Sequence, residues 1–212
     1  MAVTTIPTAG IANDAVDNTK LDLASNYAFT GTITGTPQGL TLINSTSSTS
    51  TVASFNIDNV FSSTYKFYRV YMRVEYSQNN GFFMRMLNSS GTARTANYYY
   101  GDQGLYYTNN LYYNAGNNVS SWFNGRPSGG NVAGGGNRGH HYVIDFYDPY
   151  GTSVTHTFQK YVAYHDSTGA YVQATFCGFN SNAEIHRGFT MVGNSTTNII
   201  QHDVKVYGVT NA

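Results

Sequence analysis

The chain has 212 residues, of which only 10% are charged, and its eleven basic residues balance eleven acidic ones. This balance argues against long-range attraction to a nucleic-acid backbone or to an anionic membrane. The aromatic content of 15% argues against a disordered chain, and no apolar stretch reaches the roughly 18 residues of a membrane-spanning helix.

Residues 1–39 differ in composition from the rest of the chain. They are mostly small and polar, with scattered apolar residues and the short repeat TGTITGT at 30–36. Such a segment cannot bury enough apolar surface alone to offset its ordering entropy. We therefore expect an extended N-terminal attachment arm that lies against its own domain or another chain. Its candidate contact residues are Ile6, Ile11, Val16, Leu21, Leu23, Tyr27 and Phe29.

From residue 40 onward the apolar residues alternate with a period of two, as in β-strands. Tyr68, Val70, Met72, Val74 and Tyr76 fall on one face of a strand over 65–76, which predicts a half-buried antiparallel strand. The stretch FFMRML alternates in the same way after the turn SQNNG, and this spacing predicts that the two strands form a hairpin. Further strands are predicted at 40–44, 51–57, 141–147, 154–165, 170–179, 187–193 and 203–209.

No stretch has a sustained helical period, and turn-forming clusters separate the predicted strands at short intervals. Eight or more short strands without helices predict an all-β fold. We expect an antiparallel two-sheet sandwich of jelly-roll type over 40–212, preceded by the extended arm over 1–39. The order of the strands does not follow from the sequence.

Three features invite a catalytic or metal-binding interpretation. The glycine-rich run 128–139 lacks the Gly-Lys-Ser/Thr ending of a phosphate-binding loop, and a mobile loop is the simpler interpretation. His140 and His141 are adjacent in a predicted strand, so they point to opposite faces and cannot share one metal ion, which leaves three copies of one histidine around a symmetry axis as the alternative. Asp145 and Asp148 form an acid pair, but Asp148 precedes proline, as in a turn. We therefore predict no enzyme, no cofactor and no metal site.

The region ANYYYGDQGLYYTNNLYYN (96–114) is rich in tyrosine and almost free of charge. Neighbouring residues of a strand face opposite sides, so at most one ring of each tyrosine pair enters the same core. The other ring faces solvent, another subunit or a ligand. Subunit contact is weighed above sugar binding because uncharged aromatic faces suit permanent interfaces. The candidate surface comprises Tyr98, Tyr99, Tyr100, Tyr106, Tyr107, Tyr112, Tyr113 and Trp122.

Two parts of the chain are similar to known proteins. GIANDAVDNTKLDLASNYAFTGTITGTP (10–37) resembles the N-terminal linker of tailed-phage fibre and virion surface proteins, especially those of marine phages. FSSTYKFYRVYM, FFMRMLNSSGT, NYYYG and the closing VKVYGV are similar to the C-terminal β-sandwich of such proteins. The chain is shorter than a fibre with a long repeated shaft, which favours a short fibre, knob, head fibre or capsid decoration protein.

The resemblance implies a non-enzymatic structural protein on the virion surface. It would be a homotrimer whose arm attaches to other virion proteins of the capsid or tail, without nucleic-acid binding or membrane insertion. A carbohydrate-binding adhesin that recognises host surface glycans through exposed tyrosines is the alternative. A depolymerase acting through Asp145 and Asp148 is a third hypothesis, and the absence of a long β-helical repeat disfavours it.

Overall fold

The computed structural model describes residues 39–77, 82–106, 111–124, 139–165, 170–194 and 198–209. The seven arm residues from Ile6 to Phe29 lie outside these ranges, as does nearly all of the glycine-rich run. Within the described part of the chain, no helix is long and apolar enough to cross a membrane.

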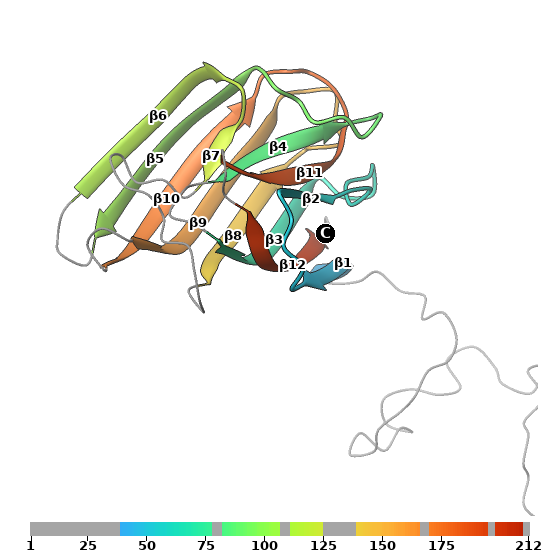
Figure 1. Ribbon diagram of the computed structural model, residues 1–212. Coiled ribbons are helices and arrows are strands. Elements are labelled where there is room, and N and C mark those ends of the chain that lie inside the picture. Colours follow the sequence, from blue (N-terminus) through green and yellow to red (C-terminus); the bar gives the residue numbers. More distant parts are fainter. Residues whose placement is uncertain are drawn as a thin grey trace, which may run out of the picture. The chain divides into compact units, whose positions relative to one another are not determined.

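The described residues form two antiparallel sheets, as the sequence predicts (Figure 1). The eight-stranded sheet has the order β1-β12-β3-β8-β9-β10-β5-β6, and the four-stranded sheet has the order β2-β11-β4-β7. The strands are β1 (Leu40–Ser48), β2 (Ser54–Ile57), β3 (Phe67–Tyr76), β4 (Phe82–Asn88), β5 (Tyr98–Tyr106), β6 (Leu111–Val119), β7 (Trp122–Asn124), β8 (His140–Tyr147), β9 (Thr155–His165), β10 (Ala170–Asn180), β11 (His186–Gly193) and β12 (Ile199–Val209).

Eight of these strands have the order of a jelly roll. One sheet contains β1, β12, β3 and β8, and the facing sheet contains β2, β11, β4 and β7. Along this set of eight the chain crosses to the other sheet at every step except from β4 to β7, which produces two nested Greek keys. The hairpins β5–β6 and β9–β10 are insertions that widen the first sheet beyond β8.

The predicted hairpin between 65–76 and FFMRML is wrong. β3 pairs with β12 and β8, whereas β4 lies in the other sheet and pairs with β11 and β7. Tyr76 at the end of β3 and Phe82 at the start of β4 stack with their ring centroids 5.0 Å apart. Both strands have an apolar face, and two facing sheets bury those faces against each other, which a single hairpin cannot do.

The core lies between the two sheets and contains the residues that the alternation predicted. Val70 and Val74 of β3 are fully buried, and so are Phe82, Met84 and Met86 of β4. Burial of each such side chain contributes about 1.5–3 kcal/mol of transfer free energy. Because β3 is buried on only one side, its alternate residues point outward from the eight-stranded sheet.

Candidate functional site

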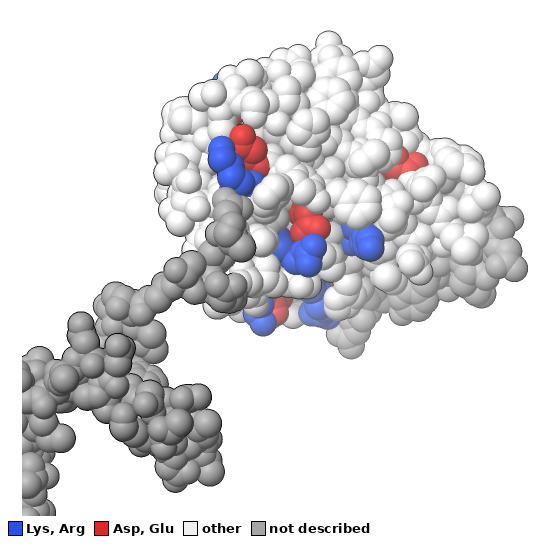
Figure 2. Space-filling view, turned by 180° about the vertical axis from the view of Figure 1, so that it is seen from behind, with Lys and Arg blue, Asp and Glu red and all other residues white. Residues whose placement is uncertain are grey.

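The outward-facing side of the eight-stranded sheet, here called the broad face, is the most distinctive surface of the described residues. Every large apolar side chain that is exposed in the described ranges belongs to a strand of this sheet. Figure 2, which views the domain from behind, shows only a few charged groups on a largely uncharged surface. An extended aromatic and apolar surface of this kind is a candidate interaction surface.

The strand register places five rings in one line across the broad face. Each member of this line is the direct cross-strand partner of the next, so all five side chains point to the same side of the sheet. At the usual strand spacing the line is about 19 Å long. This aromatic row consists of Phe67, Tyr147, His156, Phe179 and Tyr99, from β3, β8, β9, β10 and β5.

Successive rings of the aromatic row contact one another at its two ends. Phe67 and Tyr147 meet edge to face with centroids 5.3 Å apart, and Tyr99 stacks on Phe179 at 4.7 Å with only 6° between the planes. The His156 ring lies 6.0 Å from that of Phe179. A hollow of about 540 Å³ is lined by four of these rings together with smaller residues such as Gly101. This volume lies within the range of small-ligand sites.

An ion pair lies next to the aromatic row. Arg69 donates two hydrogen bonds to the Asp145 carboxylate, with Nε–Oδ1 and Nη2–Oδ2 distances of 2.7 and 2.8 Å. These bonds raise the pKa of the Arg69 guanidinium above its ordinary value. Arg69 and Asp145 are cross-strand partners two residues along from Phe67 and Tyr147, so they flank two rings of the row. Their polar atoms are charged groups beside those two rings.

The structure corrects two members of the predicted tyrosine surface. Tyr98 and Trp122 are 0% exposed and pack edge to face between the sheets, with centroids 5.1 Å apart. The Tyr98 hydroxyl accepts a hydrogen bond from the Met86 amide (2.8 Å), and Trp122 Nε1 donates one to the Phe179 carbonyl oxygen (3.3 Å). Burial raises the pKa of the Tyr98 hydroxyl. Neither ring is available to a ligand or a subunit.

The remaining predicted tyrosines divide between the two faces. Tyr99 points outward and belongs to the aromatic row, whereas Tyr100 points inward and stacks on Phe176. Burial raises the pKa of Tyr100. Gly116 lies against its ring, since a Cβ there would come within 2.3 Å of the ring. Tyr113 points outward and is 65% exposed.

Two further predicted tyrosines are placed only in part, and a third is not placed. Tyr106 lies on β5 and Tyr112 on β6, but their side chains are outside the described set. Tyr107 lies outside the described residues altogether. The division of the Tyr99–Tyr100 pair between the two faces confirms the expected alternation.

The two carboxylates of the acid pair have separate partners. Asp145 is held by Arg69, whereas Asp148 lies in the turn after β8 with a φ of 49° and accepts a hydrogen bond from Lys66 at 2.9 Å. The turn predicted at Asp148 is confirmed. No group of three or more His, Cys, Asp or Glu side chains is positioned for a metal ion among the residues that the structure describes.

The histidines divide in the way that strand alternation predicts. His140 is buried and His141 is exposed, on opposite faces of β8. His186 is fully buried, with its Nδ1 3.0 Å from the Thr155 hydroxyl and its Nε2 3.4 Å from a Glu184 oxygen. Burial, and to a lesser extent the charge of Arg94, lowers the pKa of His186 to about 4. His186 is therefore a neutral core residue at neutral pH.

Sequence reasoning missed four members of the aromatic row, namely Phe67, Tyr147, His156 and Phe179. In each strand the period-two alternation already placed them on the face opposite the core residues. The missing information was the register between strands that are up to about 110 residues apart in the chain, which aligns them in one row.

Comparison of the chain with models of known protein families, with curated proteins and with solved structures finds no match.

Proposed function

We propose that this chain is a non-enzymatic structural protein of a tailed-phage virion surface, a short trimeric fibre, knob or decoration protein. The observation that carries the proposal is the jelly-roll strand order, an architecture that capsid and lectin domains share. The resemblance of 10–37 and of the sandwich segments to virion proteins supports the same class. In this proposal the arm over 1–39 binds the capsid or tail, and the jelly roll projects outward.

The sheet edges are the surfaces that best suit contact between subunits. β1 and β6 border the eight-stranded sheet, each nine residues long and without a charged residue or proline. Leu42 of β1 is 53% exposed and Leu111 of β6 is 65% exposed. Long, uncharged edge strands pair readily with another chain unless they are covered. Contact of β1 in one subunit with β6 in the next would be head-to-tail, which closes into a ring when the rotation permits.

Immunogold electron microscopy of phage particles, with antibody against residues 40–212, tests the virion assignment. Regular label over the head or on the tail is the expected result, and it also distinguishes decoration from adsorption. Particles that carry no label, from a lysate that contains the protein, would refute the assignment. Deletion of 1–39 should abolish incorporation into particles if the arm attaches the protein.

The aromatic row favours a second function, carbohydrate binding to host surface glycans. Sugar rings present apolar faces that stack on exposed aromatic side chains, and their hydroxyls need polar partners such as the Arg69–Asp145 pair. The hollow beside Tyr99, Tyr147 and Phe179 offers rings together with the polar side chains of Asn117, His156 and Thr157, and the Arg69–Asp145 pair lies two residues along the strands from Phe67 and Tyr147. This function is compatible with a virion role, since the broad face and the sheet edges are different surfaces.

The carbohydrate function is tested by binding of the full chain to immobilised polysaccharides. Phe179→Ala and Tyr147→Ala should each reduce affinity by about tenfold, because loss of a stacked ring costs on the order of 1–1.5 kcal/mol. Tyr113→Ala is the matched control, since this exposed tyrosine lies outside the aromatic row. Equal binding by all four proteins would exclude the row as the sugar site.

A further inference from the structure

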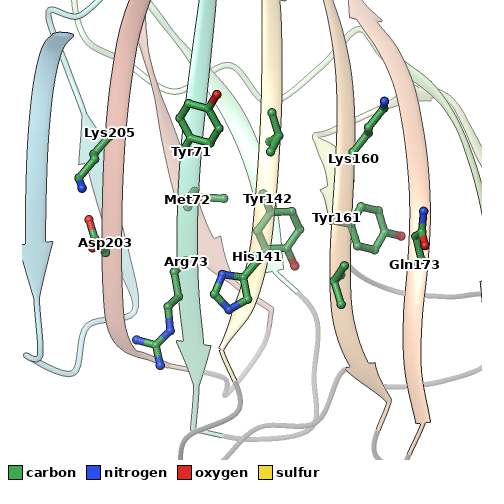
Figure 3. Close-up of a pocket in the computed structure, with 12 residues that line it drawn as sticks. Tyr71, Met72, Arg73, His141, Tyr142, Lys160, Tyr161, Gln173, Asp203 and Lys205 are labelled. Carbon is green, nitrogen blue, oxygen red and sulfur yellow. The ribbon is translucent and has the colours of Figure 1, made fainter.

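A second hollow lies on the broad face, away from the aromatic row (Figure 3). It has a volume of about 540 Å³ and spans β12, β3, β8, β9 and β10. The strand register gives it a central line of four direct cross-strand partners, Lys205, Tyr71, Val143 and Lys160. Figure 3 shows the two lysines on opposite sides of the Tyr71 ring. We call this site the lysine hollow.

Most basic side chains in the described ranges pair with an acid, and the two lysines are among those that do not. In the described ranges, bases pair with acids in the combinations Lys66–Asp148, Arg69–Asp145, Arg73–Glu75, Arg94–Glu184 and Arg187–Asp58. Lys160 and Lys205 have no such partner among the described residues, although the Lys160 ammonium lies 5.9 Å from the Phe158 ring centroid. The hollow also contains Arg73, which pairs with Glu75, and one carboxylate, Asp203. Its cations outnumber its anions, so it complements an anionic ligand.

The side chains that line the hollow between the two lysines suit a sugar. Tyr71 is 41% exposed, and the Tyr207 ring meets it edge to face at 5.7 Å, which holds the Tyr71 ring in place. Asp203 and Gln173 line the same hollow and can hydrogen-bond to hydroxyl groups. A ring with polar neighbours is the combination that binds the apolar face and the hydroxyls of one sugar unit.

We propose that the lysine hollow binds an acidic oligosaccharide, whose carboxylate or sulfate groups contact Lys160 and Lys205 while a sugar ring stacks on Tyr71. The inference rests on the carbohydrate function proposed above and specifies its ligand class. The strands of the two lysines lie three strand spacings apart, about 14 Å, and Figure 3 shows both ammonium groups directed away from Tyr71, so one anionic group does not contact both. The ligand is therefore a chain of several sugars that carries repeated negative charges.

A nucleic acid fits the hollow less well than an acidic glycan. Nucleic-acid sites have a stripe of many basic residues, because each phosphate contact needs its own cation. The lysine hollow has two lysines without an acidic partner, which is too few for a run of phosphate contacts. A glycan with widely spaced charges and many hydroxyls makes use of Asp203 as a hydrogen-bond acceptor.

The test uses acidic polysaccharides and their neutral counterparts. Polygalacturonate is compared with its carboxyl-reduced form, and a sulfated galactan with its desulfated form, each against the full chain by biolayer interferometry. Lys160→Gln and Lys205→Gln are the test variants. Lys66→Gln is the matched control, because it removes the same charge from a paired lysine outside the hollow. Single-stranded DNA of similar length is a further probe.

The expected result is that at least one acidic polysaccharide binds about tenfold more tightly than its neutral form, as loss of one charge-assisted contact predicts. Lys160→Gln and Lys205→Gln should each remove most of this difference, added salt should weaken it, and Lys66→Gln should not change it. Equal affinity for acidic and neutral forms would overturn the acidic preference but leave sugar binding intact. Binding to none of the four polysaccharides would overturn both proposals, and tighter binding to DNA would replace the glycan.

Discussion

Tyr98 and Tyr113 lie on neighbouring strands of one hairpin, and the direction of each ring sets its role. The Tyr98 ring lies between the sheets and its hydroxyl accepts the Met86 amide, whereas Tyr113 points into solvent. Buried hydroxyls are costly to remove when they leave a backbone amide without a partner. The residue type therefore says little about function until the face of the strand is known.

Tyr98→Phe should destabilise the domain by about 1–3 kcal/mol, since the Met86 amide would lose its partner in a water-free environment. Tyr113→Phe removes an equivalent hydroxyl from the surface and should change stability by less than about 0.5 kcal/mol. Chemical denaturation of both variants measures the difference. Equal stabilities would show that water or another group replaces the Tyr98 hydroxyl.

The lowered pKa of His186 predicts how the stability of the domain depends on pH. Its pKa is about 4 in the folded domain and 6.5 in an unfolded chain, so between these values the unfolded state binds the additional proton. Stability should therefore fall as pH falls from about 6.5 to 4, by up to roughly 3 kcal/mol from this residue. Burial also lowers the pKa of His202, which adds to the same trend.

His186→Gln should flatten this part of the pH profile, because glutamine keeps a hydrogen-bonding group near Thr155 but does not titrate. Denaturant midpoints measured between pH 4 and 7 test the prediction. His141→Gln is the control, since this exposed histidine lies on the opposite face of β8. A variant profile as steep as that of the original protein would assign the acid sensitivity to other groups.

At the scale of the strand, the two inserted hairpins create the surfaces that distinguish this jelly roll. β9–β10 and β5–β6 extend the first sheet beyond β8, and three of the five rings in the aromatic row belong to these hairpins. β6 then becomes the outer edge of the sheet. Without the insertions, the broad face would be four strands wide and would end at Tyr147 and Val143 of β8.

Leu111→Lys should weaken association between subunits, because a charged residue on an edge strand opposes pairing with another chain. Val162→Lys introduces the same charge in the middle of the broad face and should have little effect. Light scattering after size-exclusion chromatography gives the mass of each variant. If Val162→Lys dissociates the protein and Leu111→Lys does not, the broad face is the interface and the edges are free.

For the whole molecule, the proposed trimer predicts that stability depends on concentration. Subunits that unfold as they separate have a Tm that rises with protein concentration, whereas a monomer does not. Scanning calorimetry at two concentrations that differ by a factor of one hundred provides the measurement. A constant Tm, with a mass equal to that of one chain, would contradict the trimeric assembly.

The alternation of apolar and polar residues along the chain was sufficient to predict the all-β class and most of the strands. It also predicted which residues of a strand share a face. The core residues of β3 and β4 follow from a period of two, because adjacent side chains of an extended backbone must point to opposite sides. The same rule correctly separated Tyr99 from Tyr100 and His140 from His141. These are local properties, so they are encoded within a few residues.

The partner of each strand and the register between strands depend on residues that are far apart in the chain. For these two properties the sequence pattern was ambiguous. The predicted β3–β4 hairpin was wrong, and Tyr98 and Trp122 were wrongly placed on the surface. The sequence also could not align Phe67 with Phe179 or Lys160 with Lys205. A strand with one apolar face can bury that face against many different partners. Only the packing of the whole domain selects one strand pairing among them. The aromatic row and the lysine hollow exist because that packing brings distant strands together in register.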